Sequence, residues 1–318
     1  MNQTVLDVKN LKTEFITDKK AFPIIKDVNF TLERGKVLGI VGESGCGKSV
    51  TVNTVLNLLP KNGRIAEGEI TYFDEDKPIE LQKLKQYGKE FRKLRGENIS
   101  MIFQDPMSAL NPVYTIGNQI TEVLHEHYDI SKEEANKRAI EMLEKLGIHN
   151  AAERMNDYPH QFSGGQRQRI VIAIAMVCNP DILIADEPVS ALDLSVQAQV
   201  LNYLVEIQNK EDLTYVFISH DLGVVKYMCD YLYVIHKGRI VEAGSREDIY
   251  NNPMHIYTKK LLAAIPEVDY HFKEALATKR KENEVEFKAQ YHEFYDEDGR
   301  AYDLKQVSPT HFVALKPE

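Results

Sequence analysis

The chain has 318 residues, a formal net charge of −9 at pH 7, 43% hydrophobic residues and 27% charged residues. This composition is ordinary for a globular protein of one large or two modest domains, and the acidic balance disfavours broad, non-specific nucleic-acid binding. Three scattered cysteines without a C-x-x-C pair argue against a disulfide framework. The longest apolar run, nine residues at 170–178, is far shorter than the ~20 residues that span a bilayer.

The first third of the chain is rich in strand-like segments. Apolar and polar residues alternate at residues 5–15, 25–32 and 68–73, with a polar connection around Asp18. Alternation of this kind predicts half-buried strands, and short connections favour antiparallel pairing. We therefore expect an antiparallel sheet in this region.

A phosphate-binding loop follows an apolar, strand-like run at residues 37–41 and precedes a helix-like run at 50–59. Glycines let the backbone wrap closely around a polyphosphate, and the helix N-terminus at Val50 adds partial positive charge. Lys48 can reach the β- and γ-phosphate oxygens, and Ser49 can place its hydroxyl on Mg²⁺. In the pattern G-x-x-x-x-G-K-[ST], the loop consists of Gly42, Glu43, Ser44, Gly45, Cys46, Gly47, Lys48 and Ser49.

Residues from about 111 to 180 have a helical pattern. Ser131 and Glu134 predict a capping box, in which the serine accepts from the N3 amide and the glutamate reaches back. Apolar residues then follow one helix face, and Gly147 is expected to end the helix.

A second glycine-rich helix start lies within this helical region, at Ser163, Gly164, Gly165 and Gln166. Ser163 is a natural N-cap, and two glycines leave the unsatisfied N–H groups of the first turn without side-chain cover. This arrangement predicts a second anion site, separate from the first. The alternative, an ordinary capped helix, is disfavoured because a phosphate loop precedes the segment and paired carboxylates follow it.

The later part of the chain predicts a parallel sheet. A helix-length segment at 195–210 separates two short apolar runs, and a third run joins residues 239–242 across a tight turn, as in a hairpin. The three runs are residues 182–185, 215–219 and 231–235.

Asp186 and Glu187 directly follow the first of these runs. The carboxyl ends of parallel strands face the ligand crevice, so Asp186 can hold Mg²⁺ through water and Glu187 can polarise an attacking water. After Pro266 the chain becomes charged and then aromatic around residues 291–295, which we interpret as a linker helix and a small β appendage.

Together these segments resemble the ABC ATPase family over residues 5–265. Residues 162–166 are similar to the family's signature sequence, and residues 190–193, which include Asp193, resemble its D-loop. Gln104 matches the Q-loop glutamine and His220 the switch histidine. Phe15 stands where the family stacks an aromatic ring on adenine, with Phe22 as the competing candidate.

The resemblance implies an α/β fold with a RecA-like P-loop core and parallel sheet, an antiparallel β subdomain and an inserted α-helical subdomain. On this interpretation residues 1–265 form the nucleotide-binding domain, with the helical subdomain at about 111–180. Residues 266–318 form a small C-terminal extension, composed of the linker and the β appendage.

The resemblance also implies ATP hydrolysis at sites shared between two ATPase domains. Glu187 is expected to act as general base, His220 to hold the γ-phosphate and water geometry, and Gln104 to join Ser49 and Asp186 at Mg²⁺. The glycine-rich helix start would serve the nucleotide of the opposite subunit. The nucleotide-binding residues expected at this helix start and at the D-loop are Ser163, Gly164, Gly165, Gln166 and Asp193.

Residues 104–112 and 253–262 narrow the resemblance to the D-type ATPases of oligopeptide and dipeptide importers, and related nickel-uptake ATPases share much of this pattern. The implied partners are a second ATPase subunit, in a heterodimer with a sister chain, two transmembrane permease subunits and an extracytoplasmic peptide-binding protein, but no nucleic acid. The expected location is the cytoplasmic face of the cell membrane, as a peripheral subunit. The groove near residues 104–114, shaped by Pro106, Leu110 and Pro112, is expected to seat a permease helix.

The sequence departs from this subfamily at one point. Many members carry a cysteine cluster, associated with an iron–sulfur centre, after the segment that corresponds to residues 253–262. This chain has no cysteine beyond Cys229, so we expect no iron–sulfur cluster and expect only ATP and Mg²⁺.

Two other functions are compatible with parts of the pattern. A soluble ABC ATPase acting on DNA would carry a long coiled coil, and one acting on ribosomes would carry two ATPase domains. This chain has no heptad run between loop and signature, and only one phosphate loop. A non-hydrolysing regulatory subunit is disfavoured because Glu187 and His220 are both in place.

Overall fold

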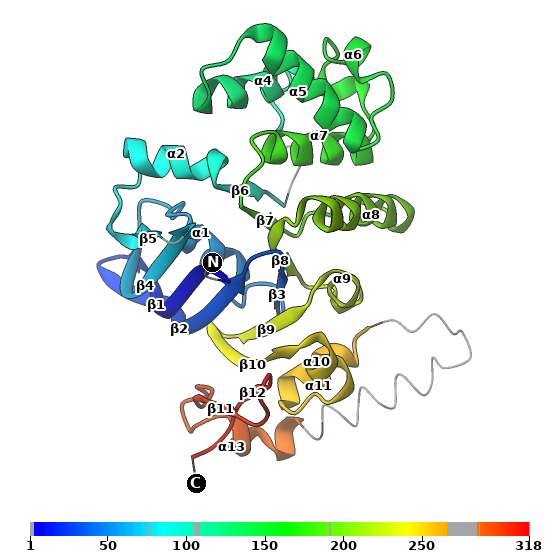
Figure 1. The fold of residues 1–318 in the computed structure, drawn as a ribbon. Coiled ribbons are helices and arrows are strands. Elements are labelled where there is room, and N and C mark those ends of the chain that lie inside the picture. Colours follow the sequence, from blue (N-terminus) through cyan, green and yellow to red (C-terminus); the bar gives the residue numbers. More distant parts are fainter. Residues whose placement is uncertain are drawn as a thin grey trace, which may run out of the picture. The chain divides into compact units, whose positions relative to one another are not determined.

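The computed structural model describes residues 3–75, 77–104, 109–190, 192–265, 285 and 287–317. The chain divides into two compact units, and Figure 1 shows their elements in chain order. The first unit comprises Met1–Glu33, Val37–Lys83 and Phe217–Glu318. The second unit comprises Arg34–Lys36 and Leu84–Val216.

The first unit contains a four-stranded antiparallel sheet in the order β2-β1-β4-β5. The predicted antiparallel sheet is therefore confirmed, although its strands are longer than the alternation indicated. Asp18 and Lys19 both have positive φ, so a two-residue turn continues β1 directly into β2 and keeps the polar strand ends paired. The strands are β1 (Thr4–Thr17), β2 (Lys20–Glu33), β4 (Gly63–Asp74) and β5 (Lys77–Glu80).

A second set of strands in this unit leads to the phosphate loop. The apolar β3 (Val37–Val41) is buried at every residue and pairs in parallel with β9 (Tyr231–His236). β9 turns back into β10 (Arg239–Ser245), which confirms the predicted hairpin. In the C-terminal tail, β12 (Phe312–Ala314) pairs with β10, and β11 (Leu304–Gln306) pairs with β12.

The helices of the first unit are short. Residues 291–294, which are strand-like in sequence, form α13 instead, and the chain returns through a turn at 296–299 to an isolated bridge between Tyr295 and Ala301. The linker residues 266–284 lie outside the described residues. The helical elements are α1 (Lys48–Val55), η1 (Leu81–Lys83), α9 (Leu222–Met228), α10 (Arg246–Asn251), α11 (Ile256–Leu262) and α13 (Tyr291–Phe294).

The second unit is mainly helical, and in it β6 (Ile99–Ile102) and β7 (Ile182–Asp186) pair in parallel. β8 (Thr214–Ser219) begins in this unit and ends in the first. None of the helices in the described part of the chain combines the length and the apolar character that crossing a bilayer requires. The helical elements of this unit are α2 (Lys89–Glu97), α4 (Ile116–His127), α5 (Lys132–Lys145), α6 (Ala151–Arg154), η2 (Pro159–Gln161), α7 (Gly164–Met176) and α8 (Leu194–Glu211).

The start of α5 corrects one sequence expectation. Ser131 Oγ accepts from the Glu134 amide at 3.1 Å, as predicted. The Glu134 carboxylate, however, bonds Arg138 Nε at 2.9 Å, so only half of the expected capping box forms. A charged partner one turn further along the helix competes successfully with the backbone N–H. Gly147 ends the helix with φ +70°, as expected.

Candidate functional site

The phosphate loop lies between the buried strand β3 and the start of α1. The ammonium group of Lys48 donates to the carbonyl oxygens of Gly42 at 2.9 Å and Glu43 at 3.0 Å. Gly42 has φ +155°, and a Cβ there would lie 2.3 Å from the carbonyl oxygen of Ile235, at the end of β9. Only glycine therefore fits at this position, which explains the first residue of the motif.

Two contacts from distant parts of the chain hold this loop. The amide of Gly238, in the β9–β10 turn, donates to Cys46 O at 2.9 Å. The amide of Glu43 donates to the hydroxyl of Tyr257, in α11, at 2.9 Å. Tyr257 was missed by sequence reasoning, because nothing in its local pattern indicates a partner 214 positions away.

All three cysteines are free and buried. Burial raises the pKa of the Cys46 and Cys229 thiols, and raises that of Cys178 to about 11. These thiols are therefore protonated and unreactive near neutral pH. In the described residues, no group of three or more His, Cys, Asp or Glu side chains has the arrangement of a metal site.

The two aromatic candidates for adenine stacking occupy one place on the sheet. Phe15 and Phe22 are directly opposed in the β1–β2 register, so their side chains share a face. Phe15 is partly buried, and a Cβ on Gly63 would lie 2.8 Å from its ring. Phe22 is half exposed. A flat ligand at this position could contact both rings.

In the second unit, the structure brings Gln104 and Glu187 together. Gln104 Nε2 donates to Glu187 Oε2 at 2.9 Å, although the residues are 83 positions apart. Gln104 follows β6 and Glu187 follows β7, and the carboxyl ends of adjacent parallel strands meet at one edge. Glu187 has a positive φ of 47° and is partly exposed, whereas Asp186, at the end of β7, is buried.

The glycine-rich start of α7 forms the predicted cap. Ser163 Oγ accepts from Gln166 N at 3.3 Å and Gln166 Oε1 accepts from Ser163 N at 3.0 Å, a complete capping box. Gly164 is exposed, and no atom of the described residues lies within 4 Å of a Cβ built there. A Cβ on Gly165 would lie 2.2 Å from Val196 Cγ1. The first glycine is thus open to solvent, and the second permits close packing against α8.

The remaining predicted site residues lie at element ends. Asp193 caps α8, where Oδ1 accepts from Val196 N at 3.0 Å and from Ser195 Oγ at 2.7 Å. The Ser195 hydrogen bond lowers the pKa of the Asp193 carboxyl. His220 is exposed and directly follows β8. The expected groove residue Pro106, within residues 105–108, and D-loop position 191 lie outside the described residues.

Comparison with known families gives two matches. A model described as "ABC transporter" matches residues 25–190, and one described as "Oligopeptide/dipeptide transporter, C-terminal region" matches residues 241–292. The chain is 47% identical over 268 residues to the dipeptide transport ATP-binding protein DppD of Bacillus subtilis (strain 168), which covers 84% of this chain and 78% of that protein. It is 41% identical over 318 residues to the oligopeptide transport ATP-binding protein OppF of Lactococcus lactis subsp. lactis (strain IL1403). This match covers 98% of this chain and 96% of that protein.

Solved structures give the same fold. The dimeric ATP-binding cassette MJ0796, in a post-hydrolysis state bound to ADP and Pi, matches with a TM-score of 0.66 and 28% identity. The match covers 76% of this chain and 98% of the MJ0796 chain. The protein cbiO1 from Clostridium perfringens, part of the ABC transporter complex cbiONQ, matches with a TM-score of 0.66 and 26% identity, over 82% of this chain and 96% of that one.

Proposed function

Because the chain belongs to the ABC transporter family of ATP-binding proteins and is an ATP hydrolase of that family, we propose that it energises peptide uptake by an importer. The names of its relatives, which are dipeptide and oligopeptide transport proteins, support this substrate class. The match of residues 241–292 to the peptide-transporter C-terminal region supports it independently of the ATPase core. We propose residues 1–265 as the ATPase domain, with a helical subdomain at about 111–180, and residues 266–318 as its linker and appendage.

The observation that carries the hydrolytic assignment is the hydrogen bond between Gln104 and Glu187. The amide of Gln104 orients the Glu187 carboxylate, and a fixed orientation toward the reacting water is what a general base requires. We assign Glu187 as general base and Gln104 as the group that orients it. His220 holds the γ-phosphate, and Lys48 neutralises charge on the transferred group.

The metal proposal follows from the donor chemistry of three residues. Ser49, Gln104 and Asp186 offer a hydroxyl, an amide oxygen and a buried carboxylate, which are the hard oxygen donors that Mg²⁺ prefers. These three would hold the ion, which when bound neutralises negative charge on the phosphate oxygens. The donor atoms of all three residues are thus of the kind that suits Mg²⁺.

We propose that two ATPase subunits complete each other's sites. The exposed start of α7 supports this, because Gly164 has no side chain to cover the N–H groups of the first turn and no described atom lies near its Cβ position. These groups would bind the γ-phosphate of the nucleotide that the opposite subunit holds. Asp193 lies at the neighbouring N-terminus of α8 and would border the same interface. The D-type resemblance favours a sister chain as the partner.

The permease is proposed to dock on the helical region of the second unit. A cavity of about 730 Å³ opens there, and Tyr114 and Val113 beside it are 54% and 72% exposed. Leu110 is buried beneath this surface. The cavity lining is mostly polar, so a permease helix would contact it mainly through polar groups, with Tyr114 and Val113 offering exposed apolar surface at the cytoplasmic face of the membrane. It is lined by Ala109, Asn111, Tyr114, Asn118, Gln119, Thr121, Glu122, His125, Lys132, Asn136 and Ile174.

Reconstitution tests the importer proposal directly. The chain would be co-expressed with candidate permease subunits and a second ATPase subunit, purified as a complex and placed in liposomes with a peptide-binding protein. We expect ATP-dependent accumulation of labelled di- or oligopeptides, abolished by Lys48→Ala. Uptake of another solute with no response to peptides would overturn the substrate class.

Crosslinking tests the docking surface in the same complex. Since all three native cysteines are buried, Asn118→Cys places a single reactive thiol at the cavity. A bifunctional crosslinker should then join the chain to a permease subunit. The matched control Asn202→Cys on α8 should give no such product. Equal crosslinking from both positions would count against this surface.

A further inference from the structure

We propose that Tyr257 is a positioning residue for the phosphate loop, acting through the Gly42–Glu43 peptide on the ammonium group of Lys48. Tyr257 lies in α11, within the segment 253–262 that carries the subfamily resemblance, but that resemblance assigns no role to its side chain. The inference rests on nucleotide binding at the loop, as proposed above. Its basis is a pair of hydrogen bonds at the two ends of one peptide group.

The hydroxyl of Tyr257 accepts from Glu43 N at 2.9 Å, and Gly42 O accepts from Lys48 Nζ at 2.9 Å. Gly42 O and Glu43 N belong to the same peptide group. This peptide is trans and planar, so its N–H and C=O point in opposite directions. Any rotation of the plane that breaks the bond to Tyr257 also turns the carbonyl away from Lys48.

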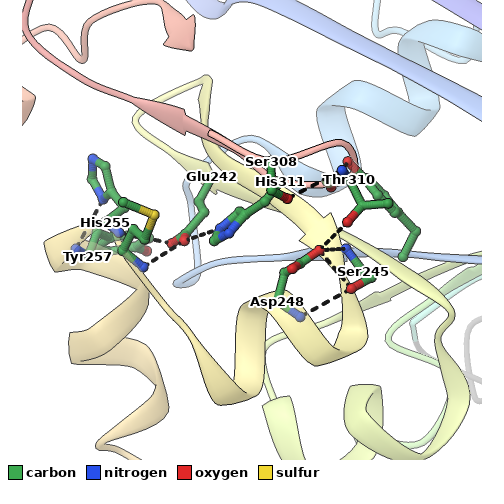
Figure 2. Close-up of polar contacts among 10 residues, drawn as sticks. Glu242, Ser245, Asp248, His255, Tyr257, Ser308, Thr310 and His311 are labelled. Atoms are coloured by element: carbon green, nitrogen blue, oxygen red, sulfur yellow. Dashed lines mark hydrogen bonds and ion pairs between the residues drawn. The ribbon is translucent and has the colours of Figure 1, made fainter. Parts of the chain in front are cut away.

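The tyrosine is itself held rigidly. Its side chain is fully buried, and its ring stacks on His236 with a centroid distance of 4.1 Å and an interplanar angle of 29°. His255 Nδ1 accepts from Tyr257 N at 3.1 Å at the start of α11. Glu242 in turn accepts from the amide of His255 at 3.1 Å (Figure 2) and from that of Met254 at 2.8 Å. The hydroxyl therefore has a fixed position from which to orient the loop.

The peptide has little freedom to find another partner. The space around Gly42 is filled by Ile235 O and Cys46 Sγ, which a Cβ would approach to 2.3 Å and 2.7 Å. The side chain of Glu43 also pairs with Lys260 at 3.0 Å, but both groups are about half exposed. Exposed ion pairs contribute little, so the buried hydroxyl is the stronger constraint on this peptide.

The variant Tyr257→Phe removes one oxygen and keeps the ring that stacks on His236. The measurement is the affinity of the full-length chain for a fluorescent ATP analogue, by titration. A lost hydrogen bond of ordinary strength predicts affinity weakened about fivefold. In a Lys48→Ala background the same substitution should change affinity less than about twofold, because the group through which Tyr257 acts is gone.

The variant Tyr215→Phe is a matched control. Tyr215 is also fully buried, and its hydroxyl donates to the carbonyl of Leu204 in the second unit. We expect it to lower thermal stability to a similar extent as Tyr257→Phe, without changing nucleotide affinity. This control separates loss of a buried hydroxyl from loss of loop positioning.

Two results would overturn the inference: wild-type affinity in Tyr257→Phe, or equal weakening with and without Lys48. The second would mean that Tyr257 supports the fold in general rather than Lys48. Failure of the wild-type chain to bind the analogue is a distinguishable outcome, since it would overturn the proposed function and this inference together.

Discussion

Glu242 and His311 are hydrogen-bonded through Oε1 and Nε2 at 2.7 Å, and both side chains are almost completely buried (Figure 2). The same carboxylate accepts from the amides of Met254 and His255. One buried acid therefore joins β10, the entry to α11 and the residue that directly precedes the tail strand β12. A second link lies beside it, where Asp248 Oδ2 accepts from Ser245 Oγ at 2.7 Å and Thr310 Oγ1 at 2.8 Å.

Removing the histidine should destabilise the first unit. The substitution His311→Ala leaves a buried carboxylate with one donor fewer, which costs about 1–3 kcal/mol. Urea denaturation measures this as a lower midpoint. His311→Gln retains an N–H donor and should recover part of the loss, whereas His292→Ala, at an exposed position in the same tail, should have little effect. An unchanged midpoint for His311→Ala would show that the link contributes no stability.

Acid should weaken the tail and α11 through two histidines. Burial is the main reason that the pKa of His236 falls from 6.5 to about 4 and that of His255 to about 3. The unfolded chain therefore binds more protons than the folded chain below pH 6.5. Stability that these residues contribute is fully present above pH 6.5 and is lost as the pH falls toward 4 and then 3.

Thermal unfolding between pH 7 and 4 measures this effect. The variant His255→Asn keeps an oxygen that can cap α11 but cannot be protonated, so its unfolding temperature should fall less steeply with acid than that of the wild type. His149→Asn, at an exposed position, is the control and should follow the wild-type curve. Parallel curves for His255→Asn and the wild type would contradict the assignment.

Hydrolysis should depend on the carboxylate of Glu187. Glu187→Gln keeps the shape and the contact with Gln104 but removes the base, so turnover should fall about 100-fold or more while ATP binding is retained. Phosphate release and nucleotide titration measure the two properties separately. Glu206→Gln, at an exposed position of α8, controls for the charge change. Near wild-type turnover in Glu187→Gln would refute this role.

The helix start at Gly164 should affect hydrolysis by the paired subunits, but not the folding or ATP binding of the single chain. A side chain fits there without contacting the described part of this chain, and aspartate suits the first turn of a helix. Gly164→Asp should therefore fold normally and bind ATP normally. Its negative charge should repel the partner's γ-phosphate and lower hydrolysis by about tenfold or more.

The neighbouring position gives a contrasting variant. In Gly165→Ala the new methyl would overlap Val196, so thermal stability should fall as well. Hydrolysis at full rate by an isolated monomer, unaffected by Gly164→Asp, would exclude the shared site.

The sequence was informative where chemistry depends on local pattern. The phosphate loop, the Ser163 cap and the strand before Asp186 follow from spacing alone, and the meeting of Gln104 with Glu187 follows once β6 and β7 are parallel neighbours. The contact between Tyr257 and Glu43 could not be predicted, because it depends on how α11 packs against the loop.

Local signals also gave misleading detail in two places. Glu134 has the sequence signature of a capping box, but Arg138 offers it a charged partner. The aromatic run at residues 291–294 is strand-like in composition, yet it forms the helix α13. In the first case a contact outside the pattern decided the structure, and in the second the local propensity was overridden, as expected when competing interactions differ by only about 1 kcal/mol.

The length of the turn between β9 and β10 is constrained by the contacts of Gly238. The amide of Gly238 donates to Cys46 O, and the carbonyl of Gly238 accepts from Lys26 N at 2.8 Å. A Cβ on Gly238 would lie 1.9 Å from Ile24 O. Both backbone groups of a single residue thus connect separate elements. A codon inserted or deleted at this turn would displace both connections at once, so drift in loop length among descendants of this gene has to occur elsewhere.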